Sequence, residues 1–293
     1  MSQIYISAAH KSSGKTTVTI GLCAALREKG LAVQAFKKGP DYIDPLWLSQ
    51  ASGRDCYNLD FFTTPSAEIQ QSYRQQQQGA DFTIIEGNKG LYDGMDLHGS
   101  DSNAAMARLL QVPVVLVINT LGITRGVAPL LLGYQAFDGA TNIAGVILNN
   151  IAGPRHEAKL IAVVEEYTNI PVVGAVRRNT AMNIDERHLG LIPSNEQHES
   201  LAIIGQIRDQ VKQQVNLDLF LSLAAKPEIQ PVGKNVSVSE VAGFSCKIGI
   251  FRDAAFGFYY PDDLLVLRSL GAELIAIDAI NDTGLPAVDA LFI

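Results

Sequence analysis

Residues 8–17 have the residue types and spacing of a phosphate-binding loop, with the sequence AAHKSSGKTT. They follow an apolar run at residues 4–6 and precede an amphipathic stretch at 18–26, which predicts a strand, a loop and a helix. Backbone N–H groups in such a loop, together with the positive end of the helix, bind a polyphosphate. We expect Lys15 to contact the outer phosphates of a nucleoside triphosphate and the Thr16 hydroxyl to bind Mg²⁺.

The loop departs from the usual Gly-x4-Gly-Lys-Ser/Thr pattern in two ways. Ala9 replaces the first glycine, and Lys11 stands four residues before Lys15, which indicates the form of the loop with two lysines. The alternative is an ordinary Ser/Gly turn before a helix, which the preceding strand disfavours. The residues expected to bind the nucleotide are Lys11, Ser12, Ser13, Gly14, Lys15, Thr16 and Thr17.

Acidic residues follow the next two predicted strands. Asp41 and Asp44 lie in residues 37–45 (KKGPDYIDP), and Glu86 opens the glycine-rich stretch EGNKGLYDG at 86–94. The carboxyl ends of parallel strands share the rim that holds the phosphate loop. Carboxylates there can organise Mg²⁺ or hold a substrate while the two lysines neutralise phosphates. The structural alternatives are an N-cap at Asp44, with Pro45 at the first helical position, and a surface turn at the glycines.

These residues give the predicted catalytic set, which is Lys15, Asp41, Asp44 and Glu86. A carboxylate at the tip of the third strand, Glu86, is well placed to contact Mg²⁺ directly or through water. Asn149 follows a later strand and could contact an adenine edge, although a turn role is nearly as well supported. Arginines near strand ends, among them Arg187, could together receive a polycarboxylate.

Strands and helices alternate along the chain. Apolar runs predict strands at 4–8, 32–36, 82–85, 112–118, 143–148 and 172–175, and helical patterns fall at 15–29, 45–51, 67–76, 102–110, 124–137 and 154–166. This order predicts an α/β fold with a doubly wound, mostly parallel sheet of the P-loop NTPase type.

A second unit is expected after the first. Further helices are expected in 197–225, which closes a first domain at 1–225, and residues 226–243 have the composition of a linker. A new strand–helix–strand pattern begins at 247, within a domain predicted at 244–293. The sequence stops within an apparent core strand at 289–293, and we expect it to be the front of a longer protein.

Bulk properties exclude several function classes. The 293 residues are 47% hydrophobic and carry a net charge of −7, which argues against a nucleic-acid or anionic membrane partner. Three scattered cysteines form no metal-binding pair. No apolar run is long enough to span a membrane, and no signal peptide is evident, so a cytoplasmic location is predicted.

Several of these motifs resemble the cobyrinic acid a,c-diamide synthase family. The resemblance lies in residues 10–17, 38–45 (KGPDYIDP), 86–94, 145–149 with 152–156, and 186–193 (ERHLGLIP). Residues 247–293, with RDAAFGFYYP at 252–261, resemble the start of that family's glutamine amidotransferase domain. The resemblance covers nearly the whole chain.

The resemblance implies a carbon–nitrogen ligase that uses ATP, Mg²⁺ and glutamine. A tetrapyrrole acetate carboxylate would form an acyl phosphate, and ammonia from glutamine would then form the amide. It implies a dethiobiotin synthetase-like first domain and an incomplete class I amidotransferase domain, whose triad would lie beyond residue 293. Cys246 is expected before the first strand of that domain and so cannot be its nucleophile. By the same resemblance, the magnesium region would comprise Thr16, Asp41 and Glu86. The residues that face the tetrapyrrole would be Tyr42, Asp44, Asp93 and Arg187. A homodimer is compatible with the family.

Two departures from the family pattern bear on the substrate. Lys89 stands where many members carry an apolar residue, and Asn119 where they carry an aspartate. Lys89 adds a cation near the expected substrate site, so a related branch that amidates siroheme or sirohydrochlorin stays open. A partition or positioning ATPase switch of the ParA/MinD type, and a biotin-pathway ligase, are the rival classes.

Overall fold

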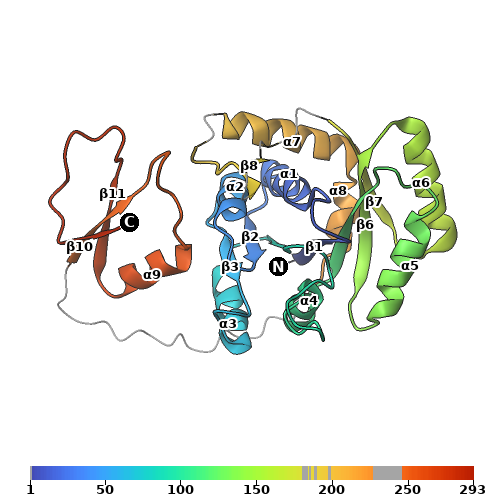
Figure 1. The fold of residues 1–293 in the computed structure, drawn as a ribbon, viewed down its shortest axis with the longest axis horizontal. Helices are drawn as coiled ribbons and strands as arrows, with labels where there is room; N and C mark the ends of the chain where they lie inside the picture. The colour runs from blue at the N-terminus through green and yellow to red at the C-terminus, as the bar shows by residue number, and fades with distance from the viewer. Residues whose placement is uncertain (1, 180–183, 185, 188–189, 197–198, 227–245) are drawn as a thin grey trace.

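A parallel seven-stranded sheet organises the larger part of the chain (Figure 1). The computed structural model describes residues 2–179, 184, 186–187, 190–196, 199–226 and 246–293. The strand order is β3-β2-β4-β1-β5-β6-β7, and all neighbours pair in parallel. The strands are β1 Ser2–Ala8, β2 Val33–Lys38, β3 Tyr57–Leu59, β4 Phe82–Glu86, β5 Val114–Asn119, β6 Ile143–Ile151 and β7 Val172–Arg177.

Helices cover both faces of this sheet because its strands are apolar on both sides. In β1, Ile4 and Ile6 pack on one face and Tyr5 on the other. The first face is covered by α1 Lys15–Glu28, α2 Ile43–Ser52, α7 Ser200–Gln214 and α8 Leu217–Ser222. The second is covered by α3 Ser66–Gln76, α4 Asn103–Leu110, α5 Val127–Phe137 and α6 Pro154–Tyr167. The predicted doubly wound fold is confirmed.

The sequence prediction missed β3, which has three residues and is too short to show a periodic pattern. A small antiparallel pair joins β8 Glu186–Arg187 to β9 Gly190–Leu191. No helix among the described residues is long and apolar enough to cross a lipid bilayer.

Residues 246–293 form a C-terminal unit beside the β3 edge of the large sheet (Figure 1). It contains β10 Cys246–Phe251, α9 Pro261–Ser269, β11 Ala272–Ile277 and β12 Ala290–Phe292, with strand order β11-β10-β12. The strand–helix–strand prediction is confirmed. Apart from Lys226, the linker expected at 226–243 lies outside the described residues.

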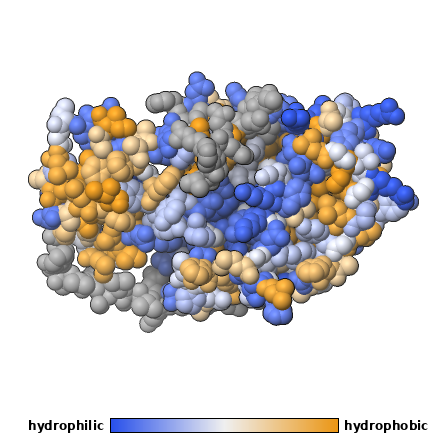
Figure 2. All heavy atoms as spheres, viewed as in Figure 1, coloured by the Kyte–Doolittle hydropathy of each residue, from blue (hydrophilic) through white to orange (hydrophobic). Residues whose placement is uncertain are grey.

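Hydrophobic residues gather on the visible face of this C-terminal unit (Figure 2). Leu291 of β12 is 43% exposed and Ile293 is 69% exposed. The strand expected at 289–293 is present as β12, and the apolar side chains of Leu291 and Ile293 at this end face solvent in the described chain.

Candidate active site

The phosphate loop connects the end of β1 to the start of α1. Ser12 and Gly14 take left-handed backbone angles, with φ of 60° and 83°, and such angles turn successive N–H groups toward one side. Gly14 immediately precedes α1, and no side chain caps this helix. The N–H groups of its first turn are therefore free of side-chain competition for an anion.

Side chains from α5 and β6 hold carbonyl groups of the loop. The Asn149 amide donates to the Ser13 carbonyl at 2.9 Å, and the Tyr134 hydroxyl donates to the Ala9 carbonyl. A Cβ on Gly14 would lie 2.1 Å from the Asn149 amide nitrogen, so glycine is required there for space as well as for its positive φ. Adenine recognition by Asn149 stays a prediction, and its observed contact is with the loop.

Lys15 begins α1 and is buried beside acidic side chains. Burial, the largest influence, lowers the pKa of Lys15 to about 8. The positive charge of Lys37 acts in the same direction, and the carboxylates of Glu86 and Asp44 oppose it. A polyphosphate next to the ammonium group would stabilise its charged form.

An ion cluster lies next to Lys15, with Lys37 and Glu86 buried and the other members half-buried. We use this name for Thr16, Lys37, Asp41, Asp44 and Glu86. The Lys37 ammonium group donates to Glu86 Oε1 at 2.9 Å and to Asp44 Oδ2. The Thr16 hydroxyl lies 2.6 Å from Glu86 Oε1 and 3.2 Å from Asp44 Oδ2. Asp41 Oδ2 is 3.9 Å from Lys37 Nζ. The structure thus joins acidic residues that were predicted from separate segments.

Sheet register explains how Lys37 reaches this cluster. β2 and β4 are neighbours, and Lys37 is paired with Glu86 across them. Side chains alternate between the faces of a strand, so Lys37 shares the face of Ala35, which is covered by α1 and α2. The next residue, Lys38, instead donates to the Asp101 carbonyl at 2.5 Å.

Charges within the ion cluster do not balance. The side chains of Lys37 and Glu86 are 3% and 0% exposed. Burial favours a lower pKa for Lys37, but the carboxylates of Asp44, Glu86 and Asp41 outweigh it and raise that pKa well above its usual range. Burial raises the pKa of Glu86 and of Asp41, and the charge of Asp44 adds to both effects. Because the carboxylates outnumber this ammonium, the cluster attracts a further cation.

The oxygen donors of the ion cluster fit Mg²⁺. Glu86 Oε2 is buried and has no hydrogen-bond partner, and the Thr16 hydroxyl lies beside the same carboxylate. Within the described parts of the chain, no group of three His, Cys, Asp or Glu residues is arranged to hold a metal alone. Mg²⁺ usually takes one or two carboxylates and completes its coordination with phosphates and water. The residues therefore fit a cation that arrives with a nucleotide.

The N-terminus of α2 corrects one interpretation of the sequence. Asp41 Oδ1 accepts the N–H groups of Ile43 and Asp44, at 2.9 and 3.0 Å. The N-cap position considered for Asp44 is occupied by Tyr42, because the helix begins at Ile43 and not at Pro45, and Asp41, one residue earlier, accepts the first N–H groups of the helix. Asp44 is free to point its carboxylate at Lys37 and Thr16.

The glycine-rich stretch after β4 packs against the phosphate loop. Leu91 N–H donates to the Ala8 carbonyl at 2.8 Å, and a Cβ on Gly90 would lie 2.6 Å from the Ala9 carbonyl oxygen. The Asp93 carboxylate accepts the Gly90 N–H at 3.0 Å. Asp93 thus shapes this loop, and its expected contact with a tetrapyrrole stays a prediction.

Asn103 at the start of α4 also fixes the glycine-rich stretch after β4. Its oxygen accepts the Tyr5 hydroxyl at 2.9 Å and the Asn88 N–H at 3.1 Å. Its amide group donates to the carbonyl groups of Asn88 and Gly90, at 2.7 and 2.6 Å. Asn103 is completely buried, so these bonds fix the path of the loop that leads away from Glu86.

The other predicted residues lie around the ion cluster at different depths. Lys11 and Ser12 are exposed on the phosphate loop, and Thr17 is half-buried in α1. Lys89 is exposed, with φ of 26°. Tyr42, between Asp41 and α2, is 38% exposed. Arg187 lies in β8, but its side chain is outside the described structure.

Asn103 and Tyr134 were not predicted as part of the site. Lys37 was expected only to neutralise phosphates together with Lys38, and not to hold the carboxylates. The readable signal for Lys37 is that it is a cation in a strand in which every residue is buried. Asn103 and Tyr134 act on loops far away in the sequence, so no local pattern indicates them.

The strand, phosphate loop and helix, with Lys15 and the acidic residues beside them, define a P-loop nucleotide-binding protein. The family described as "CobQ/CobB/MinD/ParA nucleotide binding domain" matches residues 5–192, and the chain belongs to this family. The resemblance to cobyrinic acid a,c-diamide synthases is confirmed by relatives that carry this name.

The protein named cobyrinate a,c-diamide synthase from Magnetococcus marinus is 45% identical over 99% of this chain and 63% of its own length. The protein of the same name from Methanosarcina acetivorans is 41% identical over 99% of this chain and 61% of its own length. The chain thus spans somewhat under two thirds of these relatives. The signal recognition particle receptor FtsY from Elizabethkingia anophelis is 15% identical over 70% of this chain and 65% of its own, with a TM-score of 0.44, which is too low to support an argument.

Proposed function

We propose that this protein amidates acetate side-chain carboxylates of a tetrapyrrole, using ATP and an amino group from glutamine. The observation that carries the proposal is the ion cluster beside Lys15, in which Thr16 lies 2.6 Å from Glu86. The names of the relatives support this reading. Cobyrinic acid is the first candidate substrate, and sirohydrochlorin or siroheme is the alternative.

The chemistry requires that a carboxylate be activated, because it is a poor electrophile. A carboxylate oxygen of the substrate attacks the γ-phosphorus, the bond to ADP breaks, and an acyl phosphate forms. Ammonia then attacks the acyl carbon, phosphate leaves, and the nitrogen loses a proton. Bound Mg²⁺ would offset charge on the phosphates.

The residues of this chain have separate tasks in that scheme. Lys15 and the N–H groups of the phosphate loop hold the outer phosphates, and the Lys15 charge stabilises the transferred phosphoryl group. Thr16, Glu86 and Asp41 would hold the cation. Lys37 keeps the carboxylates of Asp44 and Glu86 together, since its ammonium group contacts both.

We also propose that residues 244–293 begin the glutamine amidotransferase domain. The parallel strands β10 and β11, linked by α9, support this assignment. The chain as given should therefore not hydrolyse glutamine. It should still bind ATP and could use free ammonia. Glutaminase activity of the chain as given would overturn the domain assignment.

Substrate profiling tests the function directly. The chain as given is incubated with ATP, Mg²⁺ and ¹⁵N-ammonium, together with cobyrinic acid, sirohydrochlorin or siroheme, and amide-labelled glutamine replaces ammonium only in the complete protein. Mass spectrometry should find ¹⁵N incorporated into one macrocycle, with ADP and phosphate as coproducts. ATP turnover that depends on DNA or lipid vesicles, with every macrocycle unmodified, would favour the nucleotide-switch class instead.

A further inference from the structure

The C-terminal unit reaches the active site through aromatic rings. The Tyr42 ring centroid lies 4.3 Å from that of Tyr260 and 5.8 Å from that of Phe258. Both partners belong to residues 252–260, between β10 and α9. We call Tyr42, Phe258 and Tyr260 the aromatic contact.

The segment that carries Phe258 and Tyr260 has a defined shape. Asp253 Oδ1 accepts the N–H groups of Ala255 and Phe256, at 2.7 and 2.9 Å, and its other oxygen accepts the Ala279 N–H at 2.7 Å. The Asn195 amide of the larger part donates to the Asp253 carbonyl at 2.9 Å. These bonds present the segment to the start of α2 in a fixed orientation.

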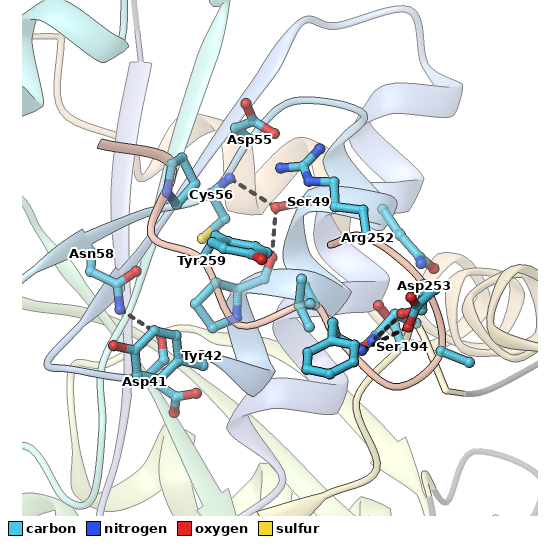
Figure 3. A pocket seen from close by; sticks show the side chains of 18 residues that line it. Asp41, Tyr42, Ser49, Asp55, Cys56, Asn58, Ser194, Arg252, Asp253 and Tyr259 are labelled. Carbon is cyan, nitrogen blue, oxygen red and sulfur yellow. Dashed lines mark hydrogen bonds between the residues drawn. The ribbon is translucent and has the colours of Figure 1, made fainter. Parts of the chain in front are cut away.

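The same segment forms one wall of a cavity of about 450 Å³, with Asp41 and Tyr42 on the opposite wall (Figure 3). Gly257 allows this approach, because a Cβ there would lie 2.7 Å from the Asn195 amide nitrogen. The aromatic contact lies at the same junction between the two parts of the chain, although Phe258 and Tyr260 do not themselves line the cavity.

Tyr42 connects that junction to the ion cluster, so a change in its position would also move residues of the cluster. It follows Asp41 directly and stands two residues before Asp44, and Asp41 Oδ1 accepts the N–H groups of Ile43 and Asp44. The Asn58 amide holds the Asp41 carbonyl at 2.8 Å. A displacement of the Tyr42 backbone would therefore move both carboxylates relative to Lys37 and Thr16.

We propose that Phe258 and Tyr260 are positioning residues, which hold Tyr42 so that Asp41 and Asp44 are correctly placed to receive a Mg²⁺–nucleotide. This inference rests on the role proposed above for the ion cluster. It makes nucleotide binding in the first part of the chain dependent on side chains of the C-terminal unit.

Calorimetric titration tests the proposal without tetrapyrrole or glutamine. Mg²⁺ is titrated into the full chain with a non-hydrolysable ATP analogue. In Phe258→Ala/Tyr260→Ala the apparent Mg²⁺ affinity should fall roughly tenfold, in line with the loss of two aromatic pairs. Tyr260→Phe keeps the ring but removes the hydroxyl that bonds to Tyr42, so its affinity should lie between that of the wild type and that of the double alanine variant. The matched control is Phe256→Ala, because Phe256 lies in the same segment but pairs with Phe251 at 5.3 Å.

A double-mutant cycle adds a test that a general loss of stability would not pass. If Tyr260 acts through Tyr42, then Tyr42→Leu and Tyr260→Ala should each weaken Mg²⁺ binding, and the double variant should be no weaker than the worse single variant. Additive losses, an unchanged affinity in the aromatic variants, or an equal loss in Phe256→Ala would overturn the proposal.

The two proposals can fail separately. Normal Mg²⁺–nucleotide coupling in a protein that amidates no macrocycle would end the proposed function and leave the positioning role standing. If the wild-type protein amidates a macrocycle but its aromatic variants bind Mg²⁺ normally, the proposed function stands and the positioning role falls.

Discussion

Replacing Lys37 by methionine gives the most direct test of the ion cluster. Methionine has a similar length but no charge, so Lys37→Met leaves Asp44 and Glu86 without their shared ammonium group. The side chains of Lys37 and Glu86 are 3% and 0% exposed, so water cannot replace the lost partner easily. Removing one partner of a buried ion pair costs about 3–5 kcal/mol.

The expected loss is large enough to measure by urea unfolding. With an m-value of about 2 kcal/mol/M, a loss of about 4 kcal/mol lowers the unfolding midpoint by about 2 M. The chain has one tryptophan, and Trp47 is buried in α2 and donates to the Ile192 carbonyl at 2.9 Å. Its fluorescence reports unfolding of the part that contains the cluster.

The pH dependence of this loss follows from the carboxylates. Burial raises the pKa of Glu86, so the folded chain binds a proton more tightly than the unfolded chain, and ionised Glu86 reduces stability above the raised pKa. Lys37 lowers that pKa, and its removal raises it further. The deficit of Lys37→Met should therefore be largest at alkaline pH and shrink as the carboxyl groups become protonated.

A surface lysine provides the control. Lys29 lies 2.9 Å from Asp218, but the two side chains are 42% and 86% exposed, so Lys29→Met should cost less than about 1 kcal/mol. If Lys37→Met were no more destabilising than Lys29→Met at alkaline pH, the argument from a buried, unbalanced cluster would be refuted.

Three further predictions concern the loops around the cluster. Asn103→Ala should lower the free energy of unfolding by about 2–4 kcal/mol, because buried polar groups lose their partners; a loss no larger than that of the exposed Asn142→Ala in urea titrations would contradict this. The pKa of Lys15 is about 8, so at about pH 9 only about a tenth of the side chain is still in the ammonium form. The nucleotide affinity measured by calorimetry should therefore be about tenfold lower at that pH than at a pH well below 8. Lys15→Arg should remove this pH dependence. A nucleotide affinity of the wild type that does not change with pH would contradict the prediction. Asp41→Asn should suppress ATP turnover more than tenfold with the urea midpoint nearly unchanged, because asparagine also caps helices; normal turnover or unfolding would reject the charge role.

The sequence by itself determined the phosphate loop, six strands of the large sheet and the acidic residues at their ends. These features are local, because a buried strand is a run of apolar residues and the loop is a fixed spacing of lysine, glycine and threonine. It also identified Asp41, Asp44 and Glu86 as partners, since carboxyl ends of parallel strands share one rim.

Only the tertiary structure decided what these residues contact. The strand order places β2 beside β4, which pairs Lys37 with Glu86 across residues distant in the sequence. The start of α2 directs its first N–H groups to Asp41, and the packing of residues 252–260 brings Phe258 and Tyr260 to Tyr42. Such contacts depend on sheet order, helix boundaries and side-chain packing between distant segments, and no local pattern of residues carries that information.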